Sequence, residues 1–498
     1  MNKFMKVIGA VAVINILARL FGFLREMVIG YQYGTSFVAD SIITAYTIPN
    51  FLYLVVGGAL TTAFISVFHK KHVNSQVFVR QTFTTILITT TLLTGLIIIF
   101  SEPILTLFFG DLTNEEFELS RNLFYWMMPS TILLVLSTWM SGVLNVESKF
   151  HLSSIAILIY NVTFLVIAVA FTYFMGAEGY GVGALISSVI MILFLILGIR
   201  KLRIYSLKPL LKIDKDSMSL WKIALPIMLG GASLQFYIII QRIFAAGFSE
   251  GSIAAVNYAS KLTQFPQAVM MTAVTTVIFP LLTKKEGEGN IKAVQDLYGK
   301  GMQYLSLLLI PTTIFAFFYA ETLIQIIFEY GNFTADSTAY TTPILRIFTL
   351  TMFLLAANTY VTRFYYAKGN SFIPLLFSLI SVFGINISVI ILLKNEFGAS
   401  SIAWGTFVSS FVNLIMLMGY LHYKYRLNMI SSNDKWIKMV LFFALLVIFM
   451  WSSTFISFES KWSTFTFGIS VLVVAVPLIM YVLKMEEIKI ILKKIVKR

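Results

Sequence analysis

Residues 7–30 read VIGAVAVINILARLFGFLREMVIG, an apolar stretch that nevertheless carries Arg19, Arg25 and Glu26. A membrane-spanning helix needs about 20 consecutive apolar residues, and this stretch is long enough. A charged side chain at the bilayer centre costs about 2.5–3.5 kcal/mol, so it persists only beside a partner or a water-filled cavity. The stretch therefore predicts a membrane helix that lines such a cavity.

The rest of the chain has the same apolar character. Of its 498 residues, 58% are hydrophobic and only 12% are charged, and the mean hydropathy is +0.85. A soluble core of this size could not bury that much apolar surface. We therefore predict an all-α integral membrane protein with fourteen transmembrane helices, with cores near residues 7–30, 36–68, 82–101, 121–146, 152–175, 181–199, 223–247, 252–283, 301–319, 338–365, 372–393, 399–421, 437–456 and 463–483.

The basic residues between these spans predict the orientation. If the N-terminus is inside, 28 of the 37 Lys and Arg residues fall on the inner side, and only Lys394 and Lys461 fall outside. Cytoplasmic loops carry the excess of basic residues, so both termini are expected in the cytoplasm of a multi-pass protein. The net charge of +14 then reflects this bias and attraction to anionic membrane lipids, and not nucleic-acid binding.

An internal duplication relates the two halves of the chain. A shift of 217 residues superimposes polar or bent positions on one another, namely Arg25 on Arg242, Asp40 on Asn257 and Pro49 on Pro266. Six helices per copy is an even number, so both copies enter the membrane from the same side. We predict two six-helix lobes related by a pseudo-two-fold axis along the membrane normal, with a binding site between them.

The duplication also predicts the domain organisation. We expect an N-terminal lobe over residues 1–200, a cytoplasmic linker over 201–222 and a C-terminal lobe over 223–426. The two extra C-terminal helices occupy residues 427–483. The basic residues 484–498 predict an amphipathic helix on the inner leaflet.

With Lys438, at the inner end of its predicted core, counted among the inner-side residues, seven basic residues fall within the predicted spans, against only two acids, Glu26 and Asp40. The basic ones are Arg19, Arg25, Arg121, Arg242, Lys261, Arg346 and Arg363. A purely structural network of buried ions should be close to neutral, because each uncompensated ion costs several kcal/mol. The excess of positive charge predicts a hydrated cavity that receives an anion.

Depth in the membrane separates these residues. Arg19 and Lys261 are expected near the midplane, one from each lobe, and are the first candidates for substrate binding. Arg25 and Arg242 lie nearer the outer surface, where a long side chain can reach the interface, but their equivalence in the repeat favours a binding role. The alternative for Arg19 and Lys261 is an internal structural pair. Arg346 is an additional candidate, for which a binding role and a structural role are equally expected.

Other residues are candidates for gating or coupling. Glu26 follows Arg19 by seven residues, with Gly22 between them, and is predicted to hold an arginine when no ligand is bound. Asp40 lies in the first turns of a span, where it either complements the helix dipole or exchanges a proton or partner as the lobes move. Pro49 and Pro266 are predicted kink points in the two longest spans.

Several kinds of chemistry find no support in the sequence. His69, His72, His151 and His422 lie at span ends without metal-ligand spacing, the chain has no cysteine, and there is no phosphate-binding loop of the G-x-x-x-x-G-K-[ST] type. We therefore predict a transporter without metal or cofactor, and not an enzyme. The acids of the outer loops, Asp111, Glu115, Glu116 and Glu118 among them, are expected to be solvated surface residues.

Several motifs resemble those of a known family. Residues 18–26 (ARLFGFLRE), Ala39-Asp40, Pro49-Asn50 and residues 58–64 (GALTTAF) resemble the opening of the bacterial MurJ (MviN) lipid II flippases. Residues 258–266 (YASKLTQFP) and 328–334 (FEYGNFT) look like later motifs of that family, and the similarity covers essentially the whole chain. The resemblance implies a member of the MOP flippase superfamily in the bacterial plasma membrane, with two lobes around a cationic cavity and a groove for a prenyl tail formed by the last two spans.

The resemblance also implies an activity. The family moves an undecaprenyl-pyrophosphate-linked peptidoglycan precursor from the inner to the outer leaflet by alternating access, driven by the membrane potential or an ion gradient. Arg19, Arg25 and Asp40 match family positions directly, whereas Lys261 stands where the family usually has arginine. Partners would be the lipid-linked pyrophosphate oligosaccharide, membrane lipids and, as a further expectation, envelope-synthesis proteins.

The sequence also departs from the family pattern. Tyr53 occupies a position where the family commonly has a cavity arginine, and Gly57 one where it commonly has glutamate. Ser260 replaces an acid that the family usually has. In the eleventh span, Asn386 is the nearest candidate for a sodium ligand, and the lack of an acid there argues against coupling to sodium.

The alternatives to a lipid II flippase are a flippase for another prenyl-linked glycan, an exporter of small cationic drugs, and a non-transporting scaffold of envelope synthesis. The excess of basic residues argues against cation export.

Overall fold

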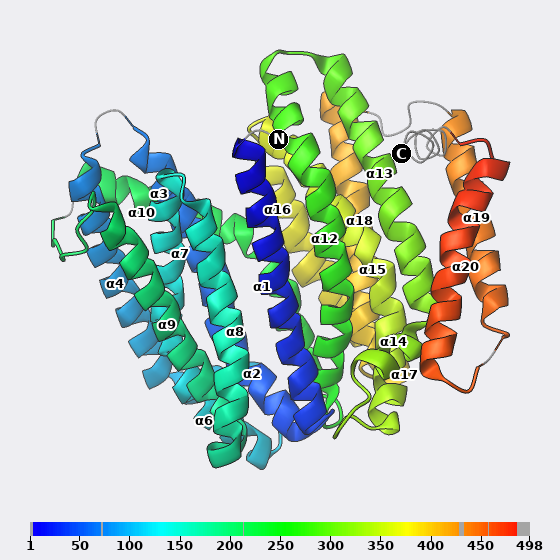
Figure 1. The fold of residues 1–498 in the computed structure, drawn as a ribbon, viewed down its shortest axis with the longest axis horizontal. Helices are drawn as coiled ribbons and strands as arrows, with labels where there is room; N and C mark the ends of the chain where they lie inside the picture. Colours follow the sequence, from blue (N-terminus) through cyan, green and yellow to red (C-terminus); the bar gives the residue numbers. More distant parts are fainter. Residues whose placement is uncertain (1–2, 71–72, 213, 428–432, 457, 486–498) are drawn as a thin grey trace. The chain divides into compact units, whose positions relative to one another are not determined.

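The computed structural model describes residues 3–70, 73–212, 214–427, 433–456 and 458–485, which form helices and no strands (Figure 1). The predicted amphipathic tail, residues 484–498, lies outside the described residues from 486 onward. The first unit of the chain contains the helices α1 (Lys3–Tyr33), α2 (Phe37–Leu52), η1 (Tyr53–Gly57), α3 (Gly58–Phe68), α4 (Ser75–Ile99), α5 (Ser101–Phe109), α6 (Asn114–Met127), α7 (Ser130–Val146), α8 (Phe150–Met175), η2 (Gly176–Glu178), α9 (Gly179–Leu202), α10 (Lys215–Gly231) and α11 (Ser233–Ala246). The helices that follow are α12 (Ser252–Gly287), α13 (Ile291–Phe318), α14 (Ala320–Ile327), α15 (Ala335–Ala367), α16 (Phe372–Leu379), η3 (Ile380–Asn386), α17 (Ile387–Phe397), α18 (Ser400–Tyr425), α19 (Asn433–Ser453) and α20 (Lys461–Val482).

The helices are long and apolar, as a membrane protein requires. Among the described residues, nine helices have the length and hydropathy to cross a bilayer, or ten if α6 and α7, bent by 43°, form one span. One of the nine, residues 150–202, contains both α8 and α9, which pack against each other. The all-α membrane class is therefore confirmed, whereas the count of fourteen spans stays a prediction.

The chain forms two compact units, residues 1–254 and 255–498. Helix α10 packs against α3 and α4 within the first unit. The predicted lobe boundaries and the pseudo-two-fold axis rest on the sequence repeat and remain predictions.

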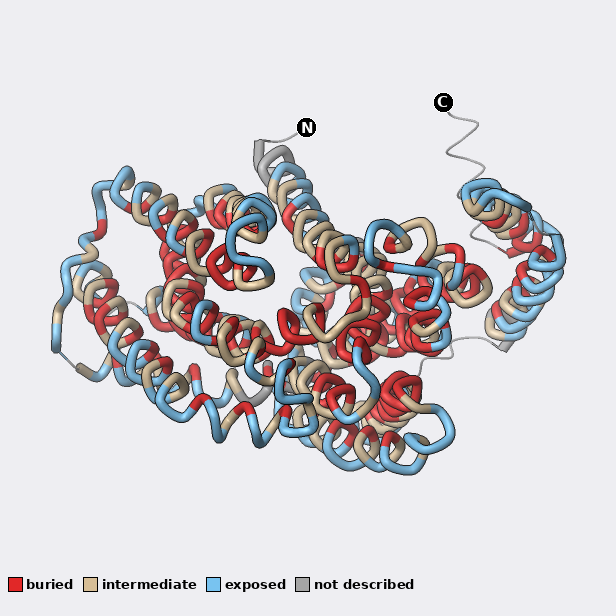
Figure 2. Tube along the Cα trace, turned by 90° about the horizontal axis from the view of Figure 1, so that it is seen from below, coloured by how far each residue is buried: buried red, intermediate tan, exposed pale blue. Residues whose placement is uncertain are grey.

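The first unit is built on close helix packing. Helix α8 packs against α1 on one side and α9 on another. A Cβ on Gly183 of α9 would lie 2.9 Å from Ala168 of α8, so this glycine lets the two helices approach closely. Buried and exposed positions alternate along the helices, so that many of them have a buried face (Figure 2).

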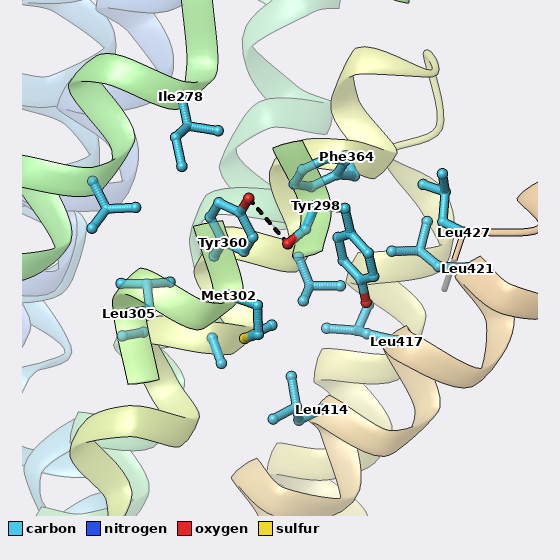
Figure 3. Close-up of a cluster of buried hydrophobic side chains, with 14 of the residues drawn as sticks. Ile278, Tyr298, Met302, Leu305, Tyr360, Phe364, Leu414, Leu417, Leu421 and Leu427 are labelled. Carbon is cyan, nitrogen blue, oxygen red and sulfur yellow. Dashed lines mark hydrogen bonds between the residues drawn. The ribbon is translucent and has the colours of Figure 1, made fainter. Parts of the chain in front are cut away.

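The second unit has an apolar core around two tyrosines. Tyr298 of α13 and Tyr360 of α15 are each 1% exposed, and leucines of α18 complete the cluster (Figure 3). The Tyr360 hydroxyl donates to the carbonyl of Leu297 at 2.7 Å, which satisfies its polar atom inside the core. A second cluster joins α19 and α20 to α13, where the hydroxyls of Tyr319 and Ser453 lie 2.8 Å apart.

Both predicted kink prolines lie inside helices. Pro49 is buried in α2, and the π-helical segment η1 follows it within the same 32-residue apolar stretch, 37–68. Proline removes a backbone donor, and π-helical turns often occur at functional sites. Pro266 lies within α12, which continues for 36 residues without a break.

Candidate functional site

A buried ion pair on α1 forms the centre of the site. Arg25 Nη2 lies 3.0 Å from Glu26 Oε1, and the two side chains are only 11% and 7% exposed. Removing two charges from water is costly, and it is offset only when the pair is close and further contacts complete it. Glu26 therefore pairs with Arg25, its immediate neighbour, and not with Arg19, which lies about two helical turns away.

Aromatic rings enclose the Arg25 guanidinium. Its central carbon lies 5.0 Å from the ring centroid of Tyr46 on α2 and 4.7 Å from that of Phe164 on α8. Both distances are within the range of cation–π attraction. The hydroxyls of Tyr46 and Tyr160 lie 3.3 Å apart, which links α2 to α8 around the same group.

Arg242 of α11 reaches the same place from another helix. Its Nη1 donates to Thr47 Oγ1 at 2.6 Å and to the carbonyl of Ile43 at 3.3 Å, and the residue is 7% exposed. Helix α2 is thus contacted by both arginines that the repeat relates, Arg25 and Arg242.

A small cavity lies between these groups, within the first unit. Its lining consists of Arg25, Glu26, Ile29, Ile42, Ile43, Tyr46, Met127, Phe164, Tyr180 and Arg242. Two guanidinium groups against one carboxylate leave the lining with an excess of positive charge. The cavity is therefore suited to an anionic group.

The remaining predicted binding residues occupy other positions. Arg19 is exposed on α1, six residues before Arg25. Lys261 on α12 and Arg346 on α15 belong to the second unit, where Lys261 is half-buried and Arg346 is exposed. Gly22 faces α8, since a Cβ there would lie 3.3 Å from Asn161 Oδ1.

Asp40 makes a defined contact at the start of α12. Its Oδ2 accepts from the backbone N–H of Gly251 at 2.8 Å and its Oδ1 from that of Ala254 at 2.6 Å. In the opposite direction, the backbone N–H of Phe37 donates to Glu250 Oε1 at 2.9 Å. A carboxylate at the first N–H groups of a helix satisfies donors that the helix itself leaves free. Asp40 thus joins the N-terminal ends of α2 and α12.

The expectation that Glu116 is a solvated surface acid is wrong. The residue is only 4% exposed, whereas its neighbour Glu115 is exposed as expected. The reason is local: Thr113 caps α6 by accepting from the backbone N–H of Glu116, and α6 packs along α2. This first turn places Glu116 on the face that meets α2, and the carbonyl of Glu116 accepts from Ser41 at 3.1 Å.

The structure gives a physical reason for one departure from the family pattern. A Cβ on Gly57 would lie 2.5 Å from Thr138 Oγ1 of α7, so glutamate or any other side chain at this position requires Thr138 or its helix to shift. Tyr53, at the other departure, is half-buried in η1.

The sequence did not single out Tyr46, Thr47, Tyr160 or Phe164 as site residues. Each follows an ordinary apolar or hydroxyl pattern within a span, so nothing in the local sequence distinguishes them. Only the duplication offered a signal, because it paired Arg25 with Arg242. In the described part of the chain, no group of three or more His, Asp or Glu side chains could hold a metal ion.

Comparisons with known proteins place this geometry in a family. The family model for the lipid II flippase MurJ matches residues 29–476. A probable lipid II flippase MurJ of Rickettsia prowazekii (strain Madrid E) is 25% identical over 419 residues, covering 82% of each chain. One of Buchnera aphidicola subsp. Schizaphis graminum is 26% identical over 481 residues, covering 93% of this chain and 92% of its own.

Solved structures show the same fold. A lipid II flippase MurJ in an inward closed conformation matches with a TM-score of 0.82 at 21% identity, over 95% of this chain and 99% of that one. An inward-facing multidrug resistance MATE transporter of the MOP superfamily matches with a TM-score of 0.68 at 15% identity, over 84% and 100%. With the family model matching most of its length, the chain belongs to the lipid II flippase MurJ family, whose members are membrane transporters.

Proposed function

We propose that this protein carries its lipid-linked substrate from the inner to the outer leaflet of the bacterial plasma membrane by alternating access, with both termini in the cytoplasm. The observation that supports the proposal most directly is the cavity lined by Arg25 and Arg242 with Glu26 as the only acid in its lining. A pyrophosphate brings negative charge and several acceptor oxygens, which guanidinium groups bind in a bidentate manner.

The pair of Arg25 and Glu26 fits a site that must also release its ligand. Without substrate, Glu26 occupies one side of the Arg25 guanidinium at 3.0 Å. An incoming anion competes with this carboxylate, so binding energy is partly spent on separating the pair. Substrate affinity is thereby limited, as turnover requires.

The other predicted residues extend this role. Arg19, exposed on the same helix as Arg25, is placed to contact the sugar or phosphate as it enters. Lys261 and Arg346 belong to the second unit and supply positive charge from that unit for binding the anionic substrate. The prenyl tail stays in lipid along α19 and α20, which expose large apolar side chains such as Val440, Ile448, Val473 and Val474. The membrane potential or an ion gradient provides the driving force, and envelope-synthesis proteins are candidate partners.

A leaflet-specific assay of the prenyl-linked precursor in cells depleted of this protein tests the proposal. We expect the precursor to accumulate in the inner leaflet, and the wild-type chain to restore its export. Arg25→Ala and Arg19→Ala should fail to restore export although folded protein is present in the membrane. The matched control is Arg121→Ala, since Arg121 makes only a partly exposed contact of 3.7 Å with Glu118.

The alternatives give different results in the same assay. Normal leaflet distribution with mislocalised synthesis enzymes would indicate a scaffold. Accumulation of another prenyl-linked glycan in place of the peptidoglycan precursor would indicate a different cargo. Full export by both arginine variants would contradict the assigned roles.

A further inference from the structure

A second pocket in the first unit has no role in the mechanism proposed above. It is formed where α4 begins and where the chain leaves α9, and its volume of about 320 Å³ is within the range of small-ligand sites. We call it the α4–α9 pocket, and its lining includes Gln76, Arg80, Arg203, Ile204, Tyr205 and Ser206. It shares no described lining residue with the cavity of Arg25 and Arg242, so it requires an explanation of its own.

The α4–α9 pocket is positively charged. Its described lining contains the guanidinium groups of Arg80 and Arg203 and no acidic side chain. Arg203 is exposed, and its side chain has no hydrogen bond or ion pair within the described part of the chain. Further basic residues follow in the same segment of the chain, Lys208 and Lys212 among them. An anion that enters the pocket therefore meets positive charge that no acid of the lining offsets.

Arg80 is held in place by neutral acceptors. Its Nε donates to the carbonyl of Lys208 at 3.0 Å, and its Nη2 donates to the carbonyl of Pro209 at 3.5 Å. Neither carbonyl carries a negative charge, so the positive charge of Arg80 stays uncompensated. A guanidinium has five N–H donors, and the three that these bonds leave free can bind an anion.

Two acids contact residues in the pocket or next to it, and both already have hydrogen-bond partners. The carboxylate of Glu147 accepts from the hydroxyl of Tyr205. The carboxylate of Asp214 accepts from the amide of Gln81 and caps the first turn of α10. Neither acid is part of the described lining, so the charge of the two arginines is left for a ligand.

The walls of the pocket are fixed before any ligand binds. The backbone N–H of Leu210 donates to Thr84 Oγ1 of α4 at 2.8 Å, which fastens the segment after α9 along α4. Tyr205 is 8% exposed, and its ring packs against that of Phe68 with 6.1 Å between the centroids. A preformed site loses less entropy when its ligand binds, so the two arginines need little rearrangement.

Exposed apolar side chains beside the pocket indicate the source of the anion. Ile204 of the lining is 44% exposed, and Leu193 and Leu197, one turn apart in the last three turns of α9, are 54% and 64% exposed. In a membrane helix such side chains contact lipid. The orientation proposed above puts the end of α9 on the cytoplasmic side, where the leaflet carries anionic lipids and basic pockets bind their headgroups.

We infer that the α4–α9 pocket binds the phosphate group of an anionic phospholipid of the inner leaflet. Arg203 and the free donors of Arg80 bind the phosphate oxygens, and the acyl chains lie against Ile204 and the exposed leucines of α9. The hydroxyl of Ser206 accepts from the backbone N–H of Lys208 and can donate its own hydrogen to the same phosphate. The bound lipid ties the segment between α9 and α10 to the membrane surface. From the proposed function the inference takes only the orientation of the chain in the membrane.

A single introduced cysteine tests occupancy of the pocket, because the chain has no cysteine of its own. Gln76→Cys places a thiol at the exposed rim, where an environment-sensitive fluorophore reports binding. The purified full-length protein in a neutral detergent is titrated with dioctanoyl phosphatidylglycerol, dioctanoyl phosphatidylcholine or inorganic phosphate. We expect a saturable response to phosphatidylglycerol at a concentration at least about tenfold below that needed for either of the other two.

Arginine variants of the labelled protein locate the site. Arg203→Gln should raise the half-saturating concentration of phosphatidylglycerol at least about tenfold, which corresponds to about 1.4 kcal/mol. The matched control is Arg426→Gln, which should leave the titration unchanged, since Arg426 is also exposed and has the same φ of +56° directly after a long helix, α18. Arg80→Gln removes the other guanidinium and serves as the second test if Arg203→Gln folds poorly.

Two further measurements separate a lipid from a soluble phosphate and from an effect of the label. Ile204→Ser should weaken the binding of phosphatidylglycerol and leave the binding of inorganic phosphate unchanged, because only the lipid has acyl chains. Native mass spectrometry of the unlabelled protein should show one bound phosphatidylglycerol fewer in Arg203→Gln than in the wild type.

Three outcomes would overturn the inference. An equal loss in Arg203→Gln and Arg426→Gln would show general attraction to basic residues, and an equal response to phosphatidylcholine would show that the headgroup charge plays no part. Inorganic phosphate that saturates the pocket as readily as the lipid would assign it to a soluble phosphate compound. Because none of the readouts involves flipping, each of these outcomes would leave the transport proposal standing.

Discussion

Two buried regions of this protein differ in the polar groups that they contain: one holds charged side chains and the other holds neutral ones. The first unit buries Arg25, Arg242 and Glu26 around a small cavity that side chains leave unfilled. The core of the second unit buries neutral tyrosines, and Tyr360 fills its surroundings so closely that a Cβ on Gly301 would lie 2.0 Å from its hydroxyl. A region selected for stability is filled and neutral, whereas a region that keeps both charge and space is arranged for a ligand.

The largest expected effect concerns the ion pair of the cavity. Arg25→Ala leaves the Glu26 carboxylate buried without its partner, which should lower the free energy of unfolding by about 3–5 kcal/mol. The double variant Arg25→Ala/Glu26→Gln removes the unpaired charge and should recover most of that stability while remaining inactive in transport. Thermal unfolding in detergent and the leaflet assay, measured together, separate the two contributions. Recovery of transport in the double variant would contradict the binding role of Arg25.

The second largest effect is expected from adding a methyl group to a glycine in each region, because the two regions differ in how closely they are packed. Gly301→Ala forces Tyr360 to move, and overpacking of a filled core costs about 1–3 kcal/mol. Gly22→Ala on the cavity side meets only Asn161 Oδ1 at 3.3 Å, at the end of a flexible side chain, and should cost less. Unfolding midpoints of the two variants compare them directly. If Gly22→Ala proves the more damaging, the cavity side is packed as rigidly as the core.

A helix cap in the loop before α10 provides a reference outside both regions. Partial burial raises the pKa of Asp214, but the N–H groups of Ser217 and Asp216 and the amide of Gln81 outweigh this and hold it below its ordinary value. The pKa is lower in the folded state, so the stabilisation is present above the unfolded pKa of about 3.9 and is lost as the pH falls through the folded value. Asp214→Ala should cost about 1 kcal/mol at neutral pH and little in acid. Melting curves across pH test this, with Asp216→Ala as the control.

The smallest effect is expected from removing one neutral hydrogen bond of the filled core. Tyr360→Phe keeps the ring but loses the 2.7 Å bond to the carbonyl of Leu297, which should cost about 0.5–1.5 kcal/mol. Transport by this variant should be normal, because the residue belongs to the neutral core of the second unit and is not among the residues that line the charged cavity. A large loss of transport with little loss of stability would show that the second core also has a functional role.

The sequence predicted the class of protein and half of the site. Hydropathy and the excess of basic residues indicated a helical transporter, and the repeat paired Arg25 with Arg242, which the structure brings to one cavity. The prediction from sequence was wrong for Glu116, which lies in a polar stretch typical of an exposed loop. Its burial depends on how α6 packs on α2, and no local pattern encodes that contact.

By itself the sequence determined the membrane environment, the helical fold and the presence of charges that lipid cannot accommodate, because hydropathy and charge are properties of each segment alone. Only the tertiary structure decided which partner each charge has. Glu26 could have met any of several arginines, and it meets Arg25; Asp40 could have complemented its own helix, and it holds the start of α12. These choices depend on distances between helices far apart in the chain, which periodicity within one helix cannot specify.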